Sequence, residues 1–121
     1  DPCPPPVDPT VDAFEPNNDR ATSTPLNLGF DVSNLYVAAA DKDLYKLVLT
    51  SRRTVRFTMN LTHANGDLDL YLYRSGTTAA VAKSDGVTDT ETINITLSAG
   101  TYYVTALGYQ NATGAYRLRV Q

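Results

Sequence analysis

Apolar and polar side chains alternate along most of this chain, and the alternation is clearest between residues 67 and 73. There three leucines occupy every second position, and Asp67, Asp69 and two tyrosines occupy the positions between them. Side chains on a β-strand point to opposite faces in turn, so this period of two predicts a half-buried strand and not an amphipathic helix. Similar runs predict strands at residues 35–37, 44–49, 54–61, 68–73, 79–82, 92–97, 101–107 and 116–120.

Turn residues separate these segments at regular intervals. Asn65-Gly66, Ser75-Gly76 and Ala99-Gly100 stand between predicted strands, and glycine and asparagine tolerate the positive φ angles that tight turns require. Short strands that recur roughly every 8–12 residues predict an all-β fold, an antiparallel β-sandwich or jelly roll of about eight strands. A length of 121 residues suits one such domain with one core.

Residues 1–11 differ from the rest in composition, because they contain five of the seven prolines. Proline fixes φ and has no amide hydrogen to donate, so we predict an extended, semi-rigid interdomain linker at 1–11 and the sandwich domain at 12–121. Cys3 lies in the linker and is the only cysteine, so no intrachain disulfide is predicted.

Charge and composition exclude several partners. The net charge is −3 and the pI is near 4.9, which argues against nucleic-acid binding, because that function needs a basic face. No run of about 18 apolar residues is present, so we predict no membrane span. Mild acidity with clustered aspartates is instead compatible with a hard cation such as calcium.

A catalytic site is difficult to assemble from these residues, and we predict no catalytic residue. His63 is the only histidine and stands beside a predicted turn. No second histidine or nearby cysteine completes a zinc site, and no glycine-rich phosphate loop is present. The alternative is a small hydrolase that uses acidic residues, because paired carboxylates serve glycoside hydrolysis.

Two groups of acidic and amide residues suggest metal binding. Glu15, Asn17 and Asn18 stand in one short polar loop, and Asp41 and Asp43 stand in another. Calcium takes 6–8 oxygen ligands, so the two loops could share an ion if the fold brings them together. The alternative is that both are solvated turns.

Asp69 is unusual because it is an acid in the middle of a strand. If its face is covered, the carboxylate needs hydrogen-bond donors, and we expect them from the backbone of a nearby turn. A ligand role for Asp69 is the alternative.

Four blocks of sequence carry a family resemblance: Phe14-Glu15-Pro16-Asn17-Asn18, Asp41 to Tyr45, Gly66 to Tyr73, and Ala99 to Val104. In this order they resemble the bacterial pre-peptidase C-terminal domain. The resemblance implies a β-sandwich accessory domain of a secreted enzyme, most often a protease, joined to the catalytic domain of its parent. Such modules aid substrate binding, secretion or maturation. A carbohydrate- or surface-adhesion module is the alternative, because the same fold can host it.

The resemblance also implies site residues. The collagen-binding domains of clostridial collagenases are similar, and they bind calcium through matching segments. By that match the calcium ligands here are Glu15, Asn17, Asn18, Asp41 and Asp43. Those domains have a second glutamate two residues before the Glu-Pro-Asn motif, where this chain has Ala13, so the resemblance implies one ion and not two. Alternatively, side-chain-to-backbone hydrogen bonds fix the loops without metal.

The collagenase domains use surface tyrosines to bind their substrate. The corresponding candidates for partner binding here are Tyr71, Tyr73, Tyr102 and Tyr103. Their partner would be an insoluble protein or a polysaccharide. Tyrosine is equally suited to packing within a sheet, which is the competing interpretation of the same residues.

Overall fold

The computed structural model describes residues 20, 23–37, 42–61, 67–86, 89–109 and 112–121. These residues form strands and turns, with no α-helix among them. The nine strands are β1 (Thr24–Leu26), β2 (Phe30–Val37), β3 (Lys42–Leu49), β4 (Arg53–Leu61), β5 (Leu68–Arg74), β6 (Ala80–Ser84), β7 (Thr90–Leu97), β8 (Gly100–Gly108) and β9 (Gly114–Val120). The predicted linker, residues 1–11, lies outside the described residues.

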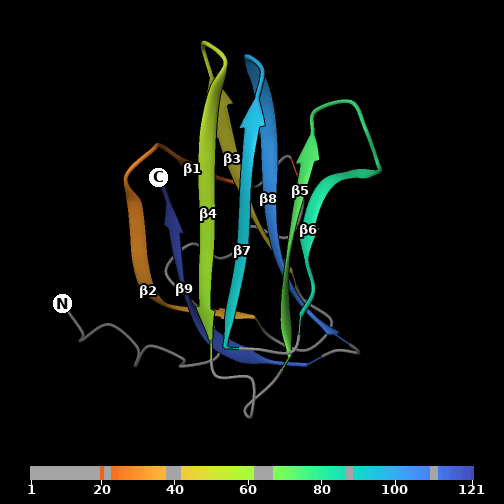
Figure 1. The fold of residues 1–121 in the computed structure, drawn as a ribbon. Coiled ribbons are helices and arrows are strands. Elements are labelled where there is room, and N and C mark those ends of the chain that lie inside the picture. The colour runs from red at the N-terminus through yellow and green to blue at the C-terminus, as the bar shows by residue number, and fades with distance from the viewer. Residues whose placement is uncertain (1–19, 21–22, 38–41, 62–66, 87–88, 110–111) are drawn as a thin grey trace, which may run out of the picture.

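The strands form two sheets that pack face to face, which confirms the predicted β-sandwich (Figure 1). One sheet has five strands in the order β1-β3-β8-β5-β6, and the other has four in the order β2-β9-β4-β7. All neighbouring strands are antiparallel except β1 and β3, which are parallel. The beginnings of β5 and β7, which belong to different sheets, lie at the same end of the sandwich (Figure 1).

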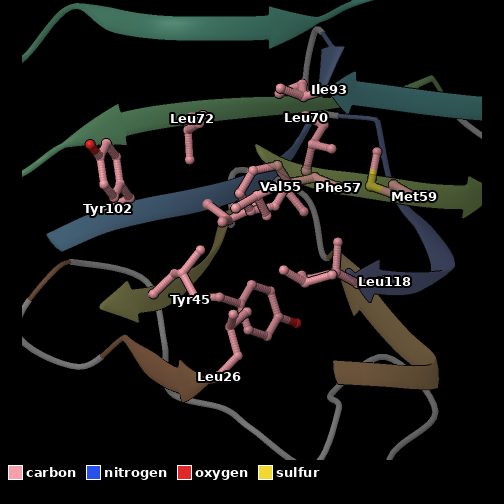
Figure 2. Packing of buried hydrophobic residues seen from close by; sticks show 14 of the residues in the cluster. Leu26, Tyr45, Val55, Phe57, Met59, Leu70, Leu72, Ile93, Tyr102 and Leu118 are labelled. Atoms are coloured by element: carbon pink, nitrogen blue, oxygen red, sulfur yellow. The ribbon is translucent and has the colours of Figure 1, made fainter. Parts of the chain in front are cut away.

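The core lies between the sheets and contains the apolar side of each alternating run. Leu68, Leu70 and Leu72 are fully buried, as the sequence predicts for that face of β5. Phe57 and Leu118 face them from the four-stranded sheet, and Figure 2 shows both together with Leu70 and Leu72. Burying apolar surface at about 25 cal/mol per Å² makes this contact between the sheets the main source of stability.

All eight predicted strands are present, but the pattern missed one strand and half of another. The edge strand β1 contains Pro25, which cannot donate to a ladder and is tolerated only at an edge. The first half of β2 was missed because the register shifts between Val32 and Leu35, and Asn34 has a φ of 62°. Such a bulge interrupts the alternation that reveals a strand.

Among the described residues, no helix has the length and apolarity needed to cross a membrane.

Candidate functional site

Three carboxylates lie close together at the end of the sandwich where β5 and β7 begin. Asp67 directly precedes β5, Asp69 lies within β5, and Glu91 lies in β7 of the opposite sheet. One carboxylate oxygen from each residue lies within 4.8 Å of the other two. We call these three residues the acidic cluster. Asp67 and Asp69 share a face because they are two positions apart on an extended chain, whereas Glu91 arrives only through the packing of the sheets.

The acidic cluster is buried and incompletely hydrogen-bonded. Asp69 is 4% exposed and Glu91 is 1% exposed. The hydroxyl of Ser84 and the amide of Gly86 both donate to Oε2 of Glu91. Within the described part of the chain, Oδ1 of Asp69 and Oε1 of Glu91 accept no hydrogen bond. The turn-backbone donor that we expected for Asp69 is therefore not found for Oδ1 among these residues.

Burial raises the pKa of two of these groups. Desolvation, together with the negative charges of Asp67, Glu91 and Asp85 and against the opposing charge of Lys83, raises the pKa of Asp69 from 3.8 to about 6. Desolvation also raises the pKa of Glu91, against the hydrogen bonds from Ser84 and Gly86. In both groups desolvation is the largest cause of the shift, so burial outweighs the interactions that favour the charged form.

Carboxylate oxygens are the ligands that hard cations prefer. With three acidic side chains at this spacing, the acidic cluster could bind a metal ion.

Asp69→Asn is expected to stabilise the protein in chelator at neutral pH. The pKa of Asp69 is higher when folded, so its stabilising contribution is complete below about pH 4 and is lost as the pH rises to about 6. Asparagine keeps the shape of the protonated acid and never ionises. Chemical denaturation in EDTA should show equal stabilities at about pH 4 and a gain of about 1–2 kcal/mol for the variant at about pH 7. A difference that does not change with pH would contradict this assignment.

Sequence reasoning singled out Asp69 but missed Glu91. The available signal was its position, because Glu91 has the same parity as Ile93, Ile95 and Leu97, the apolar side of β7. An acid on the inward side of an otherwise apolar strand needs a partner. The pattern alone, however, does not say which carboxylates it meets.

Of the predicted calcium ligands, only Asp43 is described. Glu15, Asn17, Asn18 and Asp41 lie outside the described residues. Asp43 is fully buried at the start of β3, where the hydroxyl of Tyr116 donates to its Oδ2 at 2.6 Å. The hydroxyl of Tyr45 lies 2.6 Å from that of Tyr116. Because Tyr116 gives its only hydrogen to Asp43, Tyr45 must donate to Tyr116.

The four predicted tyrosines do not share one face. Tyr71, Tyr73 and Tyr103 lie on the outer face of the five-stranded sheet, where Tyr73 pairs in register with Tyr103. The rings of Tyr71 and Tyr73 stack at 6.3 Å between centroids, and both are half-buried. Tyr102 is 2% exposed, belongs to the core and donates its hydroxyl to the carbonyl of Ser98. Neighbouring residues on a strand must face opposite sides, which separates Tyr102 from Tyr103.

Arg20 covers part of this outer face. Its guanidinium carbon lies 4.9 Å from the ring centroid of Tyr103 and 5.7 Å from that of Tyr73. These are distances at which a cation is attracted to the face of an aromatic ring. Arg20 also donates to the carbonyl of Thr77, which fixes the side chain beside β5.

A groove of about 520 Å³ lies next to Arg20 and is within the size range of ligand sites. We call it the outer-sheet groove, and its lining residues are Arg20, Lys42, Leu44, Tyr73, Thr78, Thr105 and Leu107. Two of its side chains are cationic and three are apolar or aromatic. Thr105 is 4% exposed, and within the described residues its hydroxyl has no hydrogen-bond partner. The groove therefore offers positive charge, apolar contact and a buried hydroxyl.

Comparison with known families gives one match. The model of the bacterial pre-peptidase C-terminal domain matches residues 41–108, which include β3 to β8. No curated protein sequence matches the chain.

Solved structures show the same fold. The pre-peptidase C-terminal domain of a collagenase from Bacillus anthracis superposes with a TM-score of 0.71 at 19% identity, over 82% of this chain and 94% of that one. A periplasmic inhibitor of g-type lysozyme from Aeromonas hydrophila superposes with a TM-score of 0.55 at 13% identity, over 81% of this chain and 95% of that one. At these identities the likeness concerns the fold alone.

Proposed function

The chain belongs to the bacterial pre-peptidase C-terminal domain family, and on that basis we propose that it holds a secreted peptidase on its polypeptide substrate. The domain is an accessory module of a peptidase, so its covalent partner is the catalytic domain of the parent enzyme. We further propose that the module is non-catalytic and extracellular, and that its main role is substrate binding. An accessory module joined to the catalytic domain could also aid secretion or maturation of the enzyme.

The outer-sheet groove is the observation that carries this proposal. Tyr73 and Arg20 form one wall, and Tyr71 extends the aromatic surface along β5. Tyrosine and arginine are enriched at binding hot spots because each combines a large contact area with hydrogen-bonding groups. An extended segment of polypeptide suits such a surface, since its side chains contact the rings and its carbonyls accept from the polar rim.

The positive charge of the outer-sheet groove indicates which kind of polypeptide segment would bind there. Arg20 and Lys42 place two positive charges at the groove, and the buried hydroxyl of Thr105 adds a hydrogen-bonding group. We therefore propose that the bound segment carries an acidic side chain, which lies between the two cations. An insoluble protein that carries acidic side chains is therefore favoured as the partner over an uncharged polysaccharide.

The predicted calcium site between Glu15, Asn17, Asn18, Asp41 and Asp43 remains part of the proposal. The complete burial of the Asp43 carboxylate supports a structural role for this position. An ion there would join the segment before β1 to the start of β3 and stabilise the domain.

Tyr73→Ala is expected to weaken binding to an insoluble protein by about 1–3 kcal/mol, since it removes the central aromatic wall of the groove. Binding is measured by sedimentation with insoluble collagen, a second insoluble protein and cellulose. Tyr36→Ala is the matched control, because Tyr36 is a half-buried tyrosine of β2, in the other sheet. Melting curves of both variants separate lost binding from lost stability.

The panel also distinguishes the competing functions. Equal binding of wild type and Tyr73→Ala to every protein would contradict the role of the groove. Binding to cellulose alone would identify a carbohydrate-adhesion module. Hydrolysis of peptide or glycan by the purified domain, abolished by a single substitution of an acidic residue, would overturn the non-catalytic assignment.

A further inference from the structure

Two buried carboxylate oxygens of the acidic cluster have unfilled acceptor capacity. Oδ1 of Asp69 and Oε1 of Glu91 receive no hydrogen bond from the described residues, although the two side chains are 96% and 99% buried. A buried acceptor that has lost its water and gained no donor destabilises the folded state, and more so if it is charged. Among the described residues, these two atoms therefore leave a place where a further group can bind.

The missing group must carry positive charge. Three carboxylates converge at this point, and the nearby Lys83 already pairs with Asp85 at 3.3 Å. A bound water would donate hydrogen bonds but would not offset the charge. A metal cation coordinates the carboxylate oxygens directly, in place of lost hydrogen bonds, and also offsets their negative charge.

The ligand atoms select the class of cation. All three are carboxylate oxygens, with no nitrogen or sulfur among them. Two oxygens that bind one calcium ion at the usual distance of about 2.4 Å lie no more than about 4.8 Å apart, and the three oxygens of the acidic cluster meet that limit. Calcium also tolerates irregular shells, whereas magnesium demands a near-ideal octahedron and retains its water.

We propose that Asp67, Asp69 and Glu91 bind one calcium ion that joins β5 of the five-stranded sheet to β7 of the four-stranded sheet. None of these three is among the five calcium ligands that the family resemblance implied, although a ligand role for Asp69 was the alternative there, so the site goes beyond the proposed function and is separate from the one at Asp43. Water completes the shell. Ser84 and Gly86 are positioning residues, because their hydrogen bonds to Oε2 of Glu91 fix the carboxylate that carries Oε1.

The ion has a structural consequence. β5 and β7 share no ladder of backbone hydrogen bonds, since they belong to different sheets. A calcium ion held by both strands cross-links the sheets at the end where β5 and β7 begin (Figure 1). The ion binds only the folded chain, because the unfolded chain separates Asp69 from Glu91 by 21 intervening residues.

The test counts bound calcium and measures melting temperature in the whole chain. Asp69→Asn should bind one calcium fewer than wild type by isothermal titration with calcium chloride. Wild type in excess calcium should melt about 5–10 °C above wild type in EDTA. The difference should be clearly smaller in Asp69→Asn, which retains only the calcium site proposed at Asp43. Asp31→Asn is the control, because its exposed carboxylate pairs with Arg117 on the outside of the other sheet, and it should bind as wild type does.

Two further variants make every outcome informative. Glu91→Gln keeps an acceptor for Ser84 and Gly86, so this variant should fold. It should also bind one calcium ion fewer than wild type. If Asp69→Asn does not fold, the calcium count of Glu91→Gln tests the proposed site. Glu15→Ala should leave the ion at the acidic cluster in place. The proposal is overturned if wild type binds no calcium, or if Glu91→Gln binds as much as wild type. Substrate sedimentation with Tyr73→Ala is independent of this measurement, so either proposal can fail alone.

Discussion

Replacement of Phe57 by alanine is expected to lower the free energy of unfolding by about 3–5 kcal/mol, the largest loss among the substitutions considered. Phe57 is completely buried in β4, and its ladder neighbours are Ile93 in β7 and Val120 in β9. Removing the ring deletes contacts to both sheets and leaves a cavity that a rigid sandwich does not fill. For a domain of this size, the melting temperature should fall by roughly 10–20 °C.

Val48→Ala is the matched control for this prediction. Val48 also lies in a central strand, but it is 57% exposed, so its truncation should change stability by no more than about 0.5 kcal/mol. Thermal melts and urea titrations of the two variants measure the difference directly. Similar losses for both variants would show that the core does not lie where the two sheets face each other.

Tyr116→Phe is expected to cost about 1.5–3 kcal/mol, even though it removes only one oxygen atom. Tyr116 is 3% exposed, and its hydroxyl donates to the buried Asp43 at 2.6 Å. Burial and the neighbouring Asp43 carboxylate raise the pKa of Tyr116 well above its usual value, which keeps the donating hydrogen in place over the physiological range. Phenylalanine fits the space but withdraws a donor from a carboxylate that has no access to water.

Tyr45→Phe separates the donor effect from the loss of a buried hydroxyl. Tyr45 donates to Tyr116, so its removal leaves the bond between Tyr116 and Asp43 intact. We expect a smaller loss of about 0.5–1.5 kcal/mol. Urea denaturation of the two variants tests the order of the effects, and a larger loss for Tyr45→Phe would contradict the proposed direction of the hydrogen bonds.

Most of the strands were predictable because their signal is local. A period of two is imposed by the backbone itself, so the leucines of β5 and the apolar residues of β4 identify their own buried faces. The prediction failed where the backbone departs from that geometry, at the bulge in β2 and at Pro25 in β1.

The candidate sites were predictable only in part. The sequence drew attention to Asp69, Tyr71 and Tyr73, since an acid and two tyrosines alternate with the leucines of an amphipathic strand. It did not show that Arg20 lies over Tyr73 and Tyr103. That contact joins residues more than 50 positions apart, and no local pattern records it.

The sequence by itself determined the all-β class, the inward side of the clearly alternating strands and the family, because strand periodicity and short motifs act within a few residues. Only the tertiary structure decided which polar residues meet. Glu91 reaches Asp67 and Asp69 because β7 and β5 begin at the same end of two packed sheets. The buried hydroxyl chain from Tyr45 through Tyr116 to Asp43 likewise joins strands of both sheets. Such groupings depend on how the sheets are stacked, and that stacking is set by the sum of many apolar contacts rather than by the residues that it brings together.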